Sequence, residues 1–431
     1  MHPRRGAPNP VTADDISRDR SKFTLYVVVD NGVNSRIRSL GKLRDVNTDV
    51  VFVTSKAVDV SPFKNLVVRK YPNPFGVLRA VGLHRLKQTI DSIAYFPTRH
   101  LLYVLPVLNR LNQLIADDLA RGARVVVLTC APPHALCLVG QKLKVTFPQI
   151  WWVIDWQDLW SSDETYLNVV FPLYRACAKR LEHDLVLQAD MNVTTNRFAK
   201  RAIEELHHVA PHRVAAVNHH FDGIASSPAI APNTPVSSQT LRIVFMGGMF
   251  KPPKVLGGKF LETLKQVRAR GVYLELHLYG SQGDDFERYR NAESEYGFVY
   301  HGKIPHDQVL VELRQYDYQL LLLEDLPNSR LIMHLKVPEY LNAGVPIIAI
   351  VPKDSAVQEI VERTGTGHVI PADSDWVQEL SALFEAGARP LPVRNDAEIA
   401  RFDWSNVEGD WRRALALPEG SSNDCCRSEL A

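Results

Sequence analysis

The chain has 431 residues, of which 45% are hydrophobic and 23% are charged, and its formal net charge is +2. This length exceeds what one hydrophobic core usually serves, so at least two domains are expected. The small net charge argues against bulk nucleic-acid binding and restricts any anion site to a local group of basic residues. Five cysteines at irregular spacings form neither a disulfide framework nor a metal pattern, which favours the cytoplasm as the compartment.

The two ends of the chain lack the periodicity of folded elements. Residues 1–22 are polar and contain three prolines, without the apolar core of a secretory signal, so we expect a disordered leader. We expect a disordered tail at 418–431. No run of about 18 apolar residues predicts a transmembrane helix. The nearest candidate, Leu101 to Ala116, is interrupted by Pro106 and Arg110, and it is typical of a helix in a core or on a membrane surface.

Residues 23–222 alternate between apolar runs and amphipathic stretches, which predicts strands separated by helices. Because the strands are apolar on both faces, they indicate a parallel sheet covered by helices on both sides. The predicted strands are Phe23–Asp30, Val50–Thr54, Arg124–Thr129, Ile150–Asp155, Met191–Thr194 and Arg213–Val217, and the predicted helices are Ser35–Leu43, His134–Lys144, Leu173–Ala189 and Arg197–Leu206.

Residues 223–240 are rich in proline, serine and alanine, which is typical of an interdomain linker. A second domain is predicted at 241–395, followed by a helical segment at 396–417. We therefore expect an α/β protein with two doubly wound domains facing one another across a cleft, and such sheets bind ligands beyond the carboxyl ends of their strands. The second domain has predicted strands at Leu241–Met246, Tyr273–Tyr279, Tyr300–His301, Tyr318–Leu323 and the run ending at Ile350, and predicted helices at Gly257–Arg270, Asp284–Glu295, His306–Arg314, Leu335–Ala343 and Ser374–Ala386.

The most informative segment joins a charged pair to a helix, a glycine and an apolar strand. Lys336 and Glu339 lie three residues apart near the predicted helix start, on one face of the helix. Gly344 can take the left-handed conformation that ends a helix, and Pro346 prevents the helix from continuing. A helix N-terminus beside a lysine favours an anionic ligand such as a phosphate. The segment therefore predicts an anion site.

A glycine turn at the start of the second domain supports that prediction. Gly247 and Gly248 follow the strand directly, and Lys254 lies further along the same loop. Glycines allow the backbone to approach a diphosphate closely, and a lysine adds charge. The alternative is a purely structural turn.

The ordered set of motifs resembles that of retaining glycosyltransferases of family 4, which have the two-domain GT-B fold. The segment that reads K-x-x-E-Y-L-x-A-G-x-P is the most specific member, and the resemblance runs from about Phe23 to about Trp411. The other matching segments read NSRIRSL, TCAPPHAL, DWQDLW, LEHDLVLQADMNVTTN and VNHHFD in the first domain, and LHLYGSQG, YHGKIPHDQVLVELRQYDYQLLLL and GTGHVI in the second.

The resemblance implies a nucleotide-sugar donor on the second domain and a glycan or lipid-linked acceptor on the first. The Glu339 carboxylate would accept hydrogen bonds from the ribose hydroxyls. Lys254, assisted by Lys336, would hold the donor diphosphate and stabilise the leaving-group charge. Gly247 and Gly248 would face the donor. The alternatives are a solvated carboxylate for Glu339 and a surface ammonium for Lys336.

Three positions depart from the family pattern. Many members have a second glutamate eight positions before the ribose-binding one, and Leu331 stands there in this chain. Contact with the sugar is therefore expected from Asn328 or Ser329 on the preceding loop. Gly248 stands where an arginine is often found, and Gln157 replaces another arginine. No metal site or cofactor is predicted.

On the acceptor side, the predicted catalytic residues are Asp155, Asp158 and His134. A positioned carboxylate can orient or deprotonate the acceptor hydroxyl, although aspartates also cap helices. His134 follows two prolines, and a core position is its alternative. Arg36 and Arg38 lie on the first predicted helix and could form part of a basic face toward an anionic membrane or a lipid diphosphate, or a solvated face.

The sequence thus predicts a glycosyltransferase that transfers a sugar to a hydroxyl with retention, in cell-surface polysaccharide or glycolipid synthesis at the cytoplasmic side. Since no protein nucleophile is evident, catalysis would depend on positioning and electrostatics. One alternative is a nucleotide-sugar epimerase or hydrolase of related fold. Another is a non-catalytic binding or scaffold subunit, which the departures at Leu331, Gly248 and Gln157 motivate.

Overall fold

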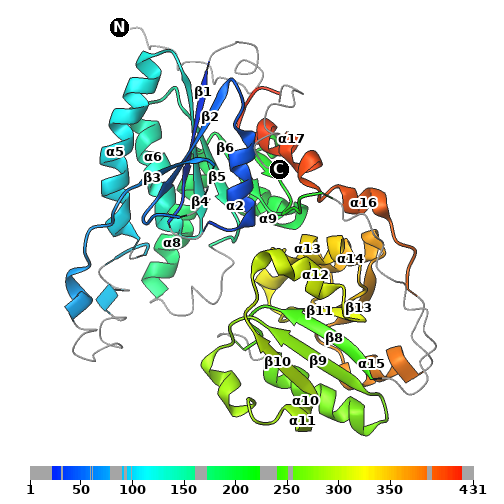
Figure 1. Cartoon of the computed structure of the whole chain (residues 1–431). Helices are drawn as coiled ribbons and strands as arrows, with labels where there is room; N and C mark the ends of the chain where they lie inside the picture. Colours follow the sequence, from blue (N-terminus) through cyan, green and yellow to red (C-terminus); the bar gives the residue numbers. More distant parts are fainter. Residues whose placement is uncertain are drawn as a thin grey trace. The chain divides into compact units, whose positions relative to one another are not determined.

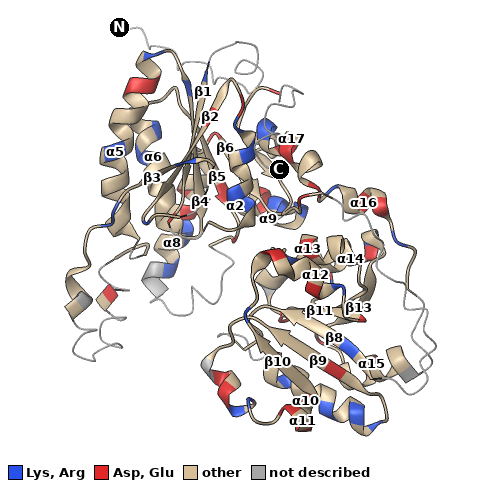
Figure 2. Ribbon diagram, in the orientation of Figure 1, with Lys and Arg blue, Asp and Glu red and all other residues tan. Residues whose placement is uncertain are grey.

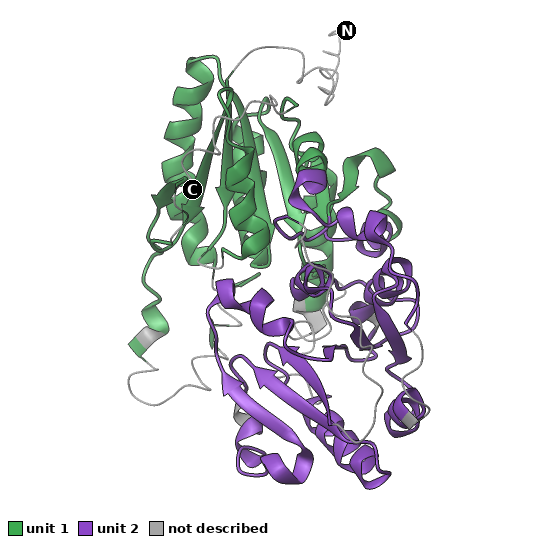
Figure 3. Cartoon of the chain, turned by 45° about the vertical axis from the view of Figure 1, so that its right-hand side comes forward, with its two compact units in different colours: residues 1–194, 203–217, 408–431 green, residues 195–202, 218–407 purple. Residues whose placement is uncertain are grey.

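The computed structural model divides into two compact units, which Figure 3 draws in two colours. Unit 1 comprises residues 1–194, 203–217 and 408–431, and unit 2 comprises 195–202 and 218–407. The predicted domains at 23–222 and 241–395 are contiguous, whereas each unit combines separate stretches of the chain. The predicted leader, linker and tail lie almost wholly outside the described residues. The structure describes residues 22–30, 33–58, 60, 62–77, 90–91, 95–98, 100–160, 172–223, 240–250, 256–385 and 391–419.

Unit 1 is built on a parallel seven-stranded sheet with the order β3-β2-β1-β4-β5-β6-β7 (Figure 1). Its strand order reverses between β1 and β4, so the loops after these two strands diverge at the sheet's carboxyl edge. The strands are β1 (Phe23–Val28), β2 (Thr48–Thr54), β3 (Lys64–Val67), β4 (Arg124–Ala131), β5 (Trp151–Trp156), β6 (Met191–Thr194) and β7 (Val214–Ala216).

Helices cover both faces of this sheet, with α5 and α6 on one side and α2 on the other (Figure 1). Within α5, Tyr103, Val107, Leu111 and Ile115 recur every fourth residue and are buried, so this face packs into the core. Among the helices that the structure describes, none has the length and apolar character needed to cross a bilayer. The helices of unit 1 are α2 (Ser35–Ser39), η1 (Leu40–Leu43), η2 (Pro74–Gly76), α5 (Leu101–Ala120), η3 (His134–Leu136), α6 (Cys137–Thr146), α8 (Pro172–Gln188) and η4 (Pro211–Arg213). Helices α9 (Arg197–His207) and α17 (Trp404–Ala414) each begin in unit 2 and end in unit 1.

Unit 2 has a parallel six-stranded sheet with the order β10-β9-β8-β11-β12-β13, which reverses between β8 and β11. The strands are β8 (Leu241–Met246), β9 (Leu274–Tyr279), β10 (Phe298–Gly302), β11 (Tyr318–Leu322), β12 (Ile347–Val351) and β13 (Gly367–Pro371). The helices are α10 (Leu256–Ala269), η5 (Asp284–Arg288), α11 (Glu293–Tyr296), η6 (His306–Gln308), α12 (Val309–Leu313), η7 (Pro327–Arg330), α13 (Lys336–Ala343), α14 (Ala356–Thr364), α15 (Trp376–Glu385) and α16 (Asp396–Ala400).

Alternate residues of these strands enter two separate cores. Ile243 and Phe245 of β8 pack on one side of the sheet with α10 and α15, and Val244 and Met246 pack on the other side with α13. Figure 1 shows this division, with α10 and α11 below the sheet and α12, α13 and α14 above it. Because α13 packs against Met246, its first turn lies at the carboxyl end of β8.

Three elements of unit 2 differ from the sequence-based expectation. The helix predicted at Asp284–Glu295 is wrong, because η5 and α11 are separate pieces with four residues between them. One of the four is Asn291, and asparagine favours local backbone bonding over helix. Helix α14 and strand β13 were not predicted as elements. Both ends of α14 carry recognisable signals, since Ser355 caps its start and Gly365 ends it with φ of +60°.

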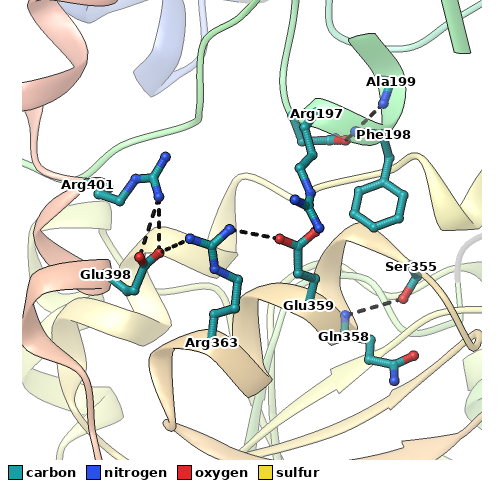
Figure 4. Close-up of polar contacts among 10 residues, drawn as sticks. Arg197, Phe198, Ala199, Ser355, Gln358, Glu359, Arg363, Glu398 and Arg401 are labelled. Atoms are coloured by element: carbon teal, nitrogen blue, oxygen red, sulfur yellow. Dashed lines mark hydrogen bonds and ion pairs between the residues drawn. The ribbon is translucent and has the colours of Figure 1, made fainter. Parts of the chain in front are cut away.

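A chain of surface ion pairs joins three helices of unit 2, as Figure 4 shows. Arg197 Nε lies 2.6 Å from Glu359 Oε2, and Arg363 bridges Glu359 at 3.0 Å and Glu398 at 2.8 Å. Arg401 extends the chain at 3.3 Å from Glu398. Because the three arginines are largely exposed and the two carboxylates partly so, each pair contributes about 1 kcal/mol or less.

Candidate functional site

The carboxyl edge of the unit 2 sheet gathers most of the predicted donor-binding residues. Ligands of doubly wound sheets bind where the strand order reverses, which is between β8 and β11 in this unit. Gly247 and Gly248 follow β8, Asn328 and Ser329 follow β11, and Lys336 stands at the start of α13. Lys254 lies outside the described residues.

Two side chains of helix α13, one turn apart, form hydrogen bonds with the backbone of Met246, the last residue of β8. Lys336 Nζ donates to the Met246 carbonyl at 3.4 Å and lies 3.6 Å from the centre of the Phe245 ring. The Tyr340 hydroxyl accepts a hydrogen bond from the Met246 backbone N–H at 3.0 Å. These contacts hold the Lys336 ammonium, half-buried, at the entrance of the Gly247 turn. A cation placed there can bind an anion that approaches the glycine turn.

The glycine turn itself depends on close backbone approach. Gly247 has φ of +129° and Gly280, which follows β9, has φ of +101°. A Cβ atom at Gly280 would lie 3.1 Å from the backbone of Gly247, so the two turns pack main chain against main chain. A side chain would therefore be strained at both positions, and at Gly280 it would also press on the backbone of Gly247.

Gln282 holds this turn in place and was not among the predicted site residues. Its Nε2 donates to the Gly247 carbonyl at 2.9 Å, and its Oε1 accepts from the Met249 N–H at 2.9 Å. A side-chain amide is suited to this task because it donates and accepts at once. The signal in the sequence was a polar residue three positions after a buried strand, within the segment LHLYGSQG.

Glu339 lies on the first turn of α13 with 27% of its side chain exposed. Its Oε1 is 3.6 Å from Nε2 of His306, which belongs to the loop after β10. Burial raises the pKa of the Glu339 carboxyl, whereas the charges of His306 and Lys336 act in the opposite direction. The carboxylate is thus a hydrogen-bond acceptor at the rim of the same edge, one turn from the Lys336 ammonium.

The loop after β11 carries Asn328 and Ser329 in the short helix η7. Ser329 is buried and Asn328 is half-buried, so Asn328 is the more accessible of the two predicted sugar-binding residues. Asn196 fastens this loop, because its Nδ2 donates to the Leu331 carbonyl at 2.7 Å. This hydrogen bond fixes the backbone of the loop at Leu331.

In unit 1, the Asp155 carboxylate is wholly buried. Its side chain and that of Arg36 are both 0% exposed, with Arg36 Nη2 2.8 Å from Asp155 Oδ1. Arg36 also donates to the Val217 carbonyl at 2.7 Å and stacks on Trp411 at 4.7 Å. The expectation that Arg36 belongs to an exposed basic face is wrong, because its guanidinium is neutralised inside the unit. Figure 2 shows acidic and basic segments interspersed over both units.

The other acceptor-side candidates differ from Asp155 and from each other. Asp158 is exposed at the end of β5. His134 is 4% exposed and stacks on Trp160 with ring centres 4.8 Å apart, so its ring packs in the aromatic core. Gln157 donates to Asp155 at 3.2 Å and accepts from Asn34 at 2.9 Å. The cation that pairs with Asp155 is thus Arg36, from another part of the chain.

A charged cluster at the carboxyl end of β1 was missed at the sequence level. Asp30 Oδ2 accepts a hydrogen bond from Lys70 Nζ at 2.6 Å and lies 3.0 Å from His100 Nε2, and Oδ1 accepts from the Ser55 hydroxyl. Burial raises the pKa of Asp30, but the hydrogen bonds from His100, Lys70 and Ser55 outweigh it and the pKa is lowered. The cluster stands where the strand order of unit 1 reverses, which is the usual ligand edge.

Residues able to hold a metal do not gather in the described parts of the chain, where no group of three or more histidine, cysteine, aspartate or glutamate side chains has a suitable arrangement. The candidate site therefore consists of hydrogen-bonding and charged side chains at the two sheet edges.

Comparison with known proteins identifies the fold of this chain. No family model and no curated protein sequence matches the chain. The apo lipopolysaccharide outer core galactosyltransferase WaaB has a TM-score of 0.57 at 13% identity, over 91% of this chain and 99% of that one. HepE of Anabaena, in complex with UDP and glucose, has a TM-score of 0.60 at 12% identity, with the same two coverages of 91% and 99%.

The N-terminal domain of trehalose-6-phosphate phosphatase from Candida albicans is also similar, with a TM-score of 0.55 at 13% identity over 92% of this chain and 94% of that one. Identities this low establish architecture alone. Together with the two parallel sheets, these likenesses show that the chain has the GT-B fold, with two Rossmann-like α/β units.

Proposed function

We propose that the chain is a retaining glycosyltransferase that moves a sugar from a nucleoside-diphosphate donor to an acceptor hydroxyl. The observation that carries this proposal is the placement of Lys336 and Glu339 beside the Gly247 turn, at the edge where the strand order of unit 2 reverses. The HepE structure, which contains UDP and glucose, supports a nucleotide-sugar site on this fold.

On the donor side, each residue has a task that its chemistry suits. The Glu339 carboxylate accepts hydrogen bonds from the two ribose hydroxyls. The Lys336 ammonium, together with Lys254, binds the diphosphate and stabilises the charge that develops as the sugar departs. Gly247 and Gly248 allow the phosphates to approach the backbone, and Asn328 donates to a sugar hydroxyl.

On the acceptor side, Asp158 is the candidate that orients the incoming hydroxyl, because its side chain is exposed and Asp155 is not. The Asp30 cluster adds a second polar group at the same kind of edge, with Lys70 and His100 partly exposed. In a front-face reaction the departing diphosphate helps to take the proton of the acceptor, so these groups act by positioning.

The setting we propose is the synthesis of a cell-surface polysaccharide or glycolipid at the inner face of the membrane, without a required metal. The motifs similar to those of family 4 support it, as does the likeness to a lipopolysaccharide galactosyltransferase. A basic face toward the membrane would have to depend on exposed residues such as Arg38 rather than on Arg36.

A second candidate is a protein of this fold that binds nucleotides without transferring sugar. Leu331 in place of a glutamate and Gly248 in place of an arginine favour it, because both substitutions remove charged groups from the donor side. The likeness to a domain of a phosphatase is a reminder that one fold supports several functions.

The first experiment is a thermal-shift panel with uridine, guanosine and adenosine diphosphates. A ligand that binds only the folded chain raises its melting temperature, by an amount that grows with concentration over Kd. Matching nucleotide sugars are then incubated with the protein, with and without a mixture of polysaccharide and lipid-linked acceptors. Release of nucleoside diphosphate only with acceptor supports the transferase, release without acceptor indicates a hydrolase, and binding without release indicates the non-catalytic protein.

A further inference from the structure

The Glu339 carboxylate, which we assign to the ribose, lies close to another side chain of the same chain. His306 Nε2 lies 3.6 Å from Glu339 Oε1. The His306 side chain is 75% exposed and comes from η6, the short helix in the loop after β10, whereas Glu339 is only 27% exposed. A solvent-exposed imidazole therefore stands on the open side of a half-buried carboxylate.

The two oxygen atoms of the Glu339 carboxylate cannot bind His306 and both ribose hydroxyls at the same time. A ribose offers two neighbouring hydroxyls, which together use both oxygens of a carboxylate. An imidazole at Oε1 takes one of these positions and blocks the approach to it. Because His306 is mostly in solvent, it can turn away at little cost in packing.

Protonation of the imidazole decides how strongly it competes. Histidine side chains change charge between about pH 5 and pH 8, and only the cation forms an ion pair with a carboxylate. Burial raises the pKa of the Glu339 carboxyl, and besides His306 the charge that opposes this is the Lys336 ammonium on the same helix. Helix α12 packs against α13, and its Glu312 accepts hydrogen bonds from the Tyr279 hydroxyl at 2.5 Å and the Tyr316 hydroxyl at 3.2 Å.

We propose that His306 covers the Glu339 carboxylate in the free protein and is displaced by the ribose, so that donor affinity falls as the pH is lowered. This inference rests on the proposed function, because it requires that Glu339 bind the ribose. It assigns to His306 a positioning task in the donor site, with no part in the transfer itself.

The test is calorimetric titration of the best nucleoside diphosphate from the panel, at about pH 6 and about pH 8, into wild type, His306→Gln and His301→Gln. His301 is the matched control, since it is also exposed but stacks on Tyr279 at 4.5 Å instead of facing Glu339. Comparing the proteins at one pH cancels the titration of the free nucleotide itself.

Wild type and His301→Gln are expected to lose about two- to fivefold more affinity between the two pH values than His306→Gln does, which is the range expected of a partly exposed ion pair. At the lower pH, His306→Gln should bind more tightly than wild type. An unchanged pH profile in His306→Gln overturns the inference, as does weaker binding by His306→Gln at both pH values. If no nucleoside diphosphate binds wild type at either pH, the proposed function fails and the inference with it.

Discussion

The carboxyl edges of the two sheets both carry charged side chains, but they use them differently. In unit 1 the carboxylates are paired within the protein: Asp155 with Arg36, both wholly buried, and the buried Asp30 with Lys70 and His100, which are partly exposed. In unit 2, Glu339 keeps 27% of its surface exposed and faces an imidazole at 3.6 Å. A buried pair such as Arg36–Asp155 is costly to break, whereas the partly exposed Glu339 carboxylate is the one that we propose binds the ribose.

The largest stability effect is expected from breaking the buried pair of unit 1. Replacing Arg36 by alanine leaves the Asp155 carboxylate charged and without its guanidinium, which should cost about 3–5 kcal/mol. The matched control is Arg38→Ala on the same helix, where the side chain is exposed and the change should stay within about 0.5 kcal/mol. Urea unfolding measures both. Equal effects of the two substitutions would mean that the buried pair is not distinctive.

The glycine turns at the edge of unit 2 provide the next test. Gly280→Ala should lower the free energy of unfolding by about 1–3 kcal/mol, because alanine is strained at φ of +101° and its Cβ would press on Gly247. Gly271→Ala is the control: φ is +88° there, but no atom lies within 4 Å of the added Cβ. Only Gly280→Ala should also weaken nucleotide binding. Equal loss of nucleotide affinity in Gly280→Ala and Gly271→Ala would show that the Gly247 turn has no special part in nucleotide binding.

Asp30 tests how far the unit 1 cluster is structural. Its pKa is lowered in the folded protein, since its hydrogen bonds outweigh its burial, so its contribution is fully present above the unfolded-state pKa of about 3.9 and is lost as the pH falls through the folded-state pKa. At pH 7, Asp30→Asn should be less stable by about 1–3 kcal/mol, and the difference should shrink below about pH 4. Unfolding curves at several pH values measure this. If the stability difference between wild type and Asp30→Asn does not vary with pH, the effect comes from the packing of the side chain and not from its charge.

The smallest effect is expected at the surface ion pairs of unit 2. Arg363→Ala removes the link between Glu359 and Glu398, and because the Arg363 guanidinium is exposed to solvent, the cost should be about 1 kcal/mol or less and should shrink in high salt. Thermal unfolding at low and high salt measures it. A loss comparable to that of Arg36→Ala would remove the contrast between buried and exposed charges.

Sequence patterns predicted the parallel sheets well, because apolar runs such as Leu241–Met246 have both faces buried and leave a continuous signal. They did worse where an element is short or lacks that signal. The break between η5 and α11 depends on local backbone bonding that a polar amphipathic stretch hides, and α14 was overlooked although Ser355 and Gly365 mark its ends.

Side-chain partners were the least predictable part of the site. Lys336 and Glu339 could be found because they share one helix turn with a recognisable motif. Arg36 and Asp155 are 119 positions apart, so nothing local indicates that they neutralise each other. The same holds for His306, which comes to Glu339 from a different loop, and for Gln282, whose task depends on the shape of the Gly247 turn.

The most direct test of the donor site is the affinity of Glu339→Ala for the nucleoside diphosphate that wild type binds best, measured by calorimetric titration. The matched control is Glu362→Ala, an exposed glutamate on α14. Because hydrogen bonds to a charged acceptor are worth about 1.5–3 kcal/mol, we predict that Glu339→Ala weakens binding about tenfold or more, and that Glu362→Ala binds like wild type. Wild-type affinity in Glu339→Ala would contradict the assignment of this carboxylate to the ribose.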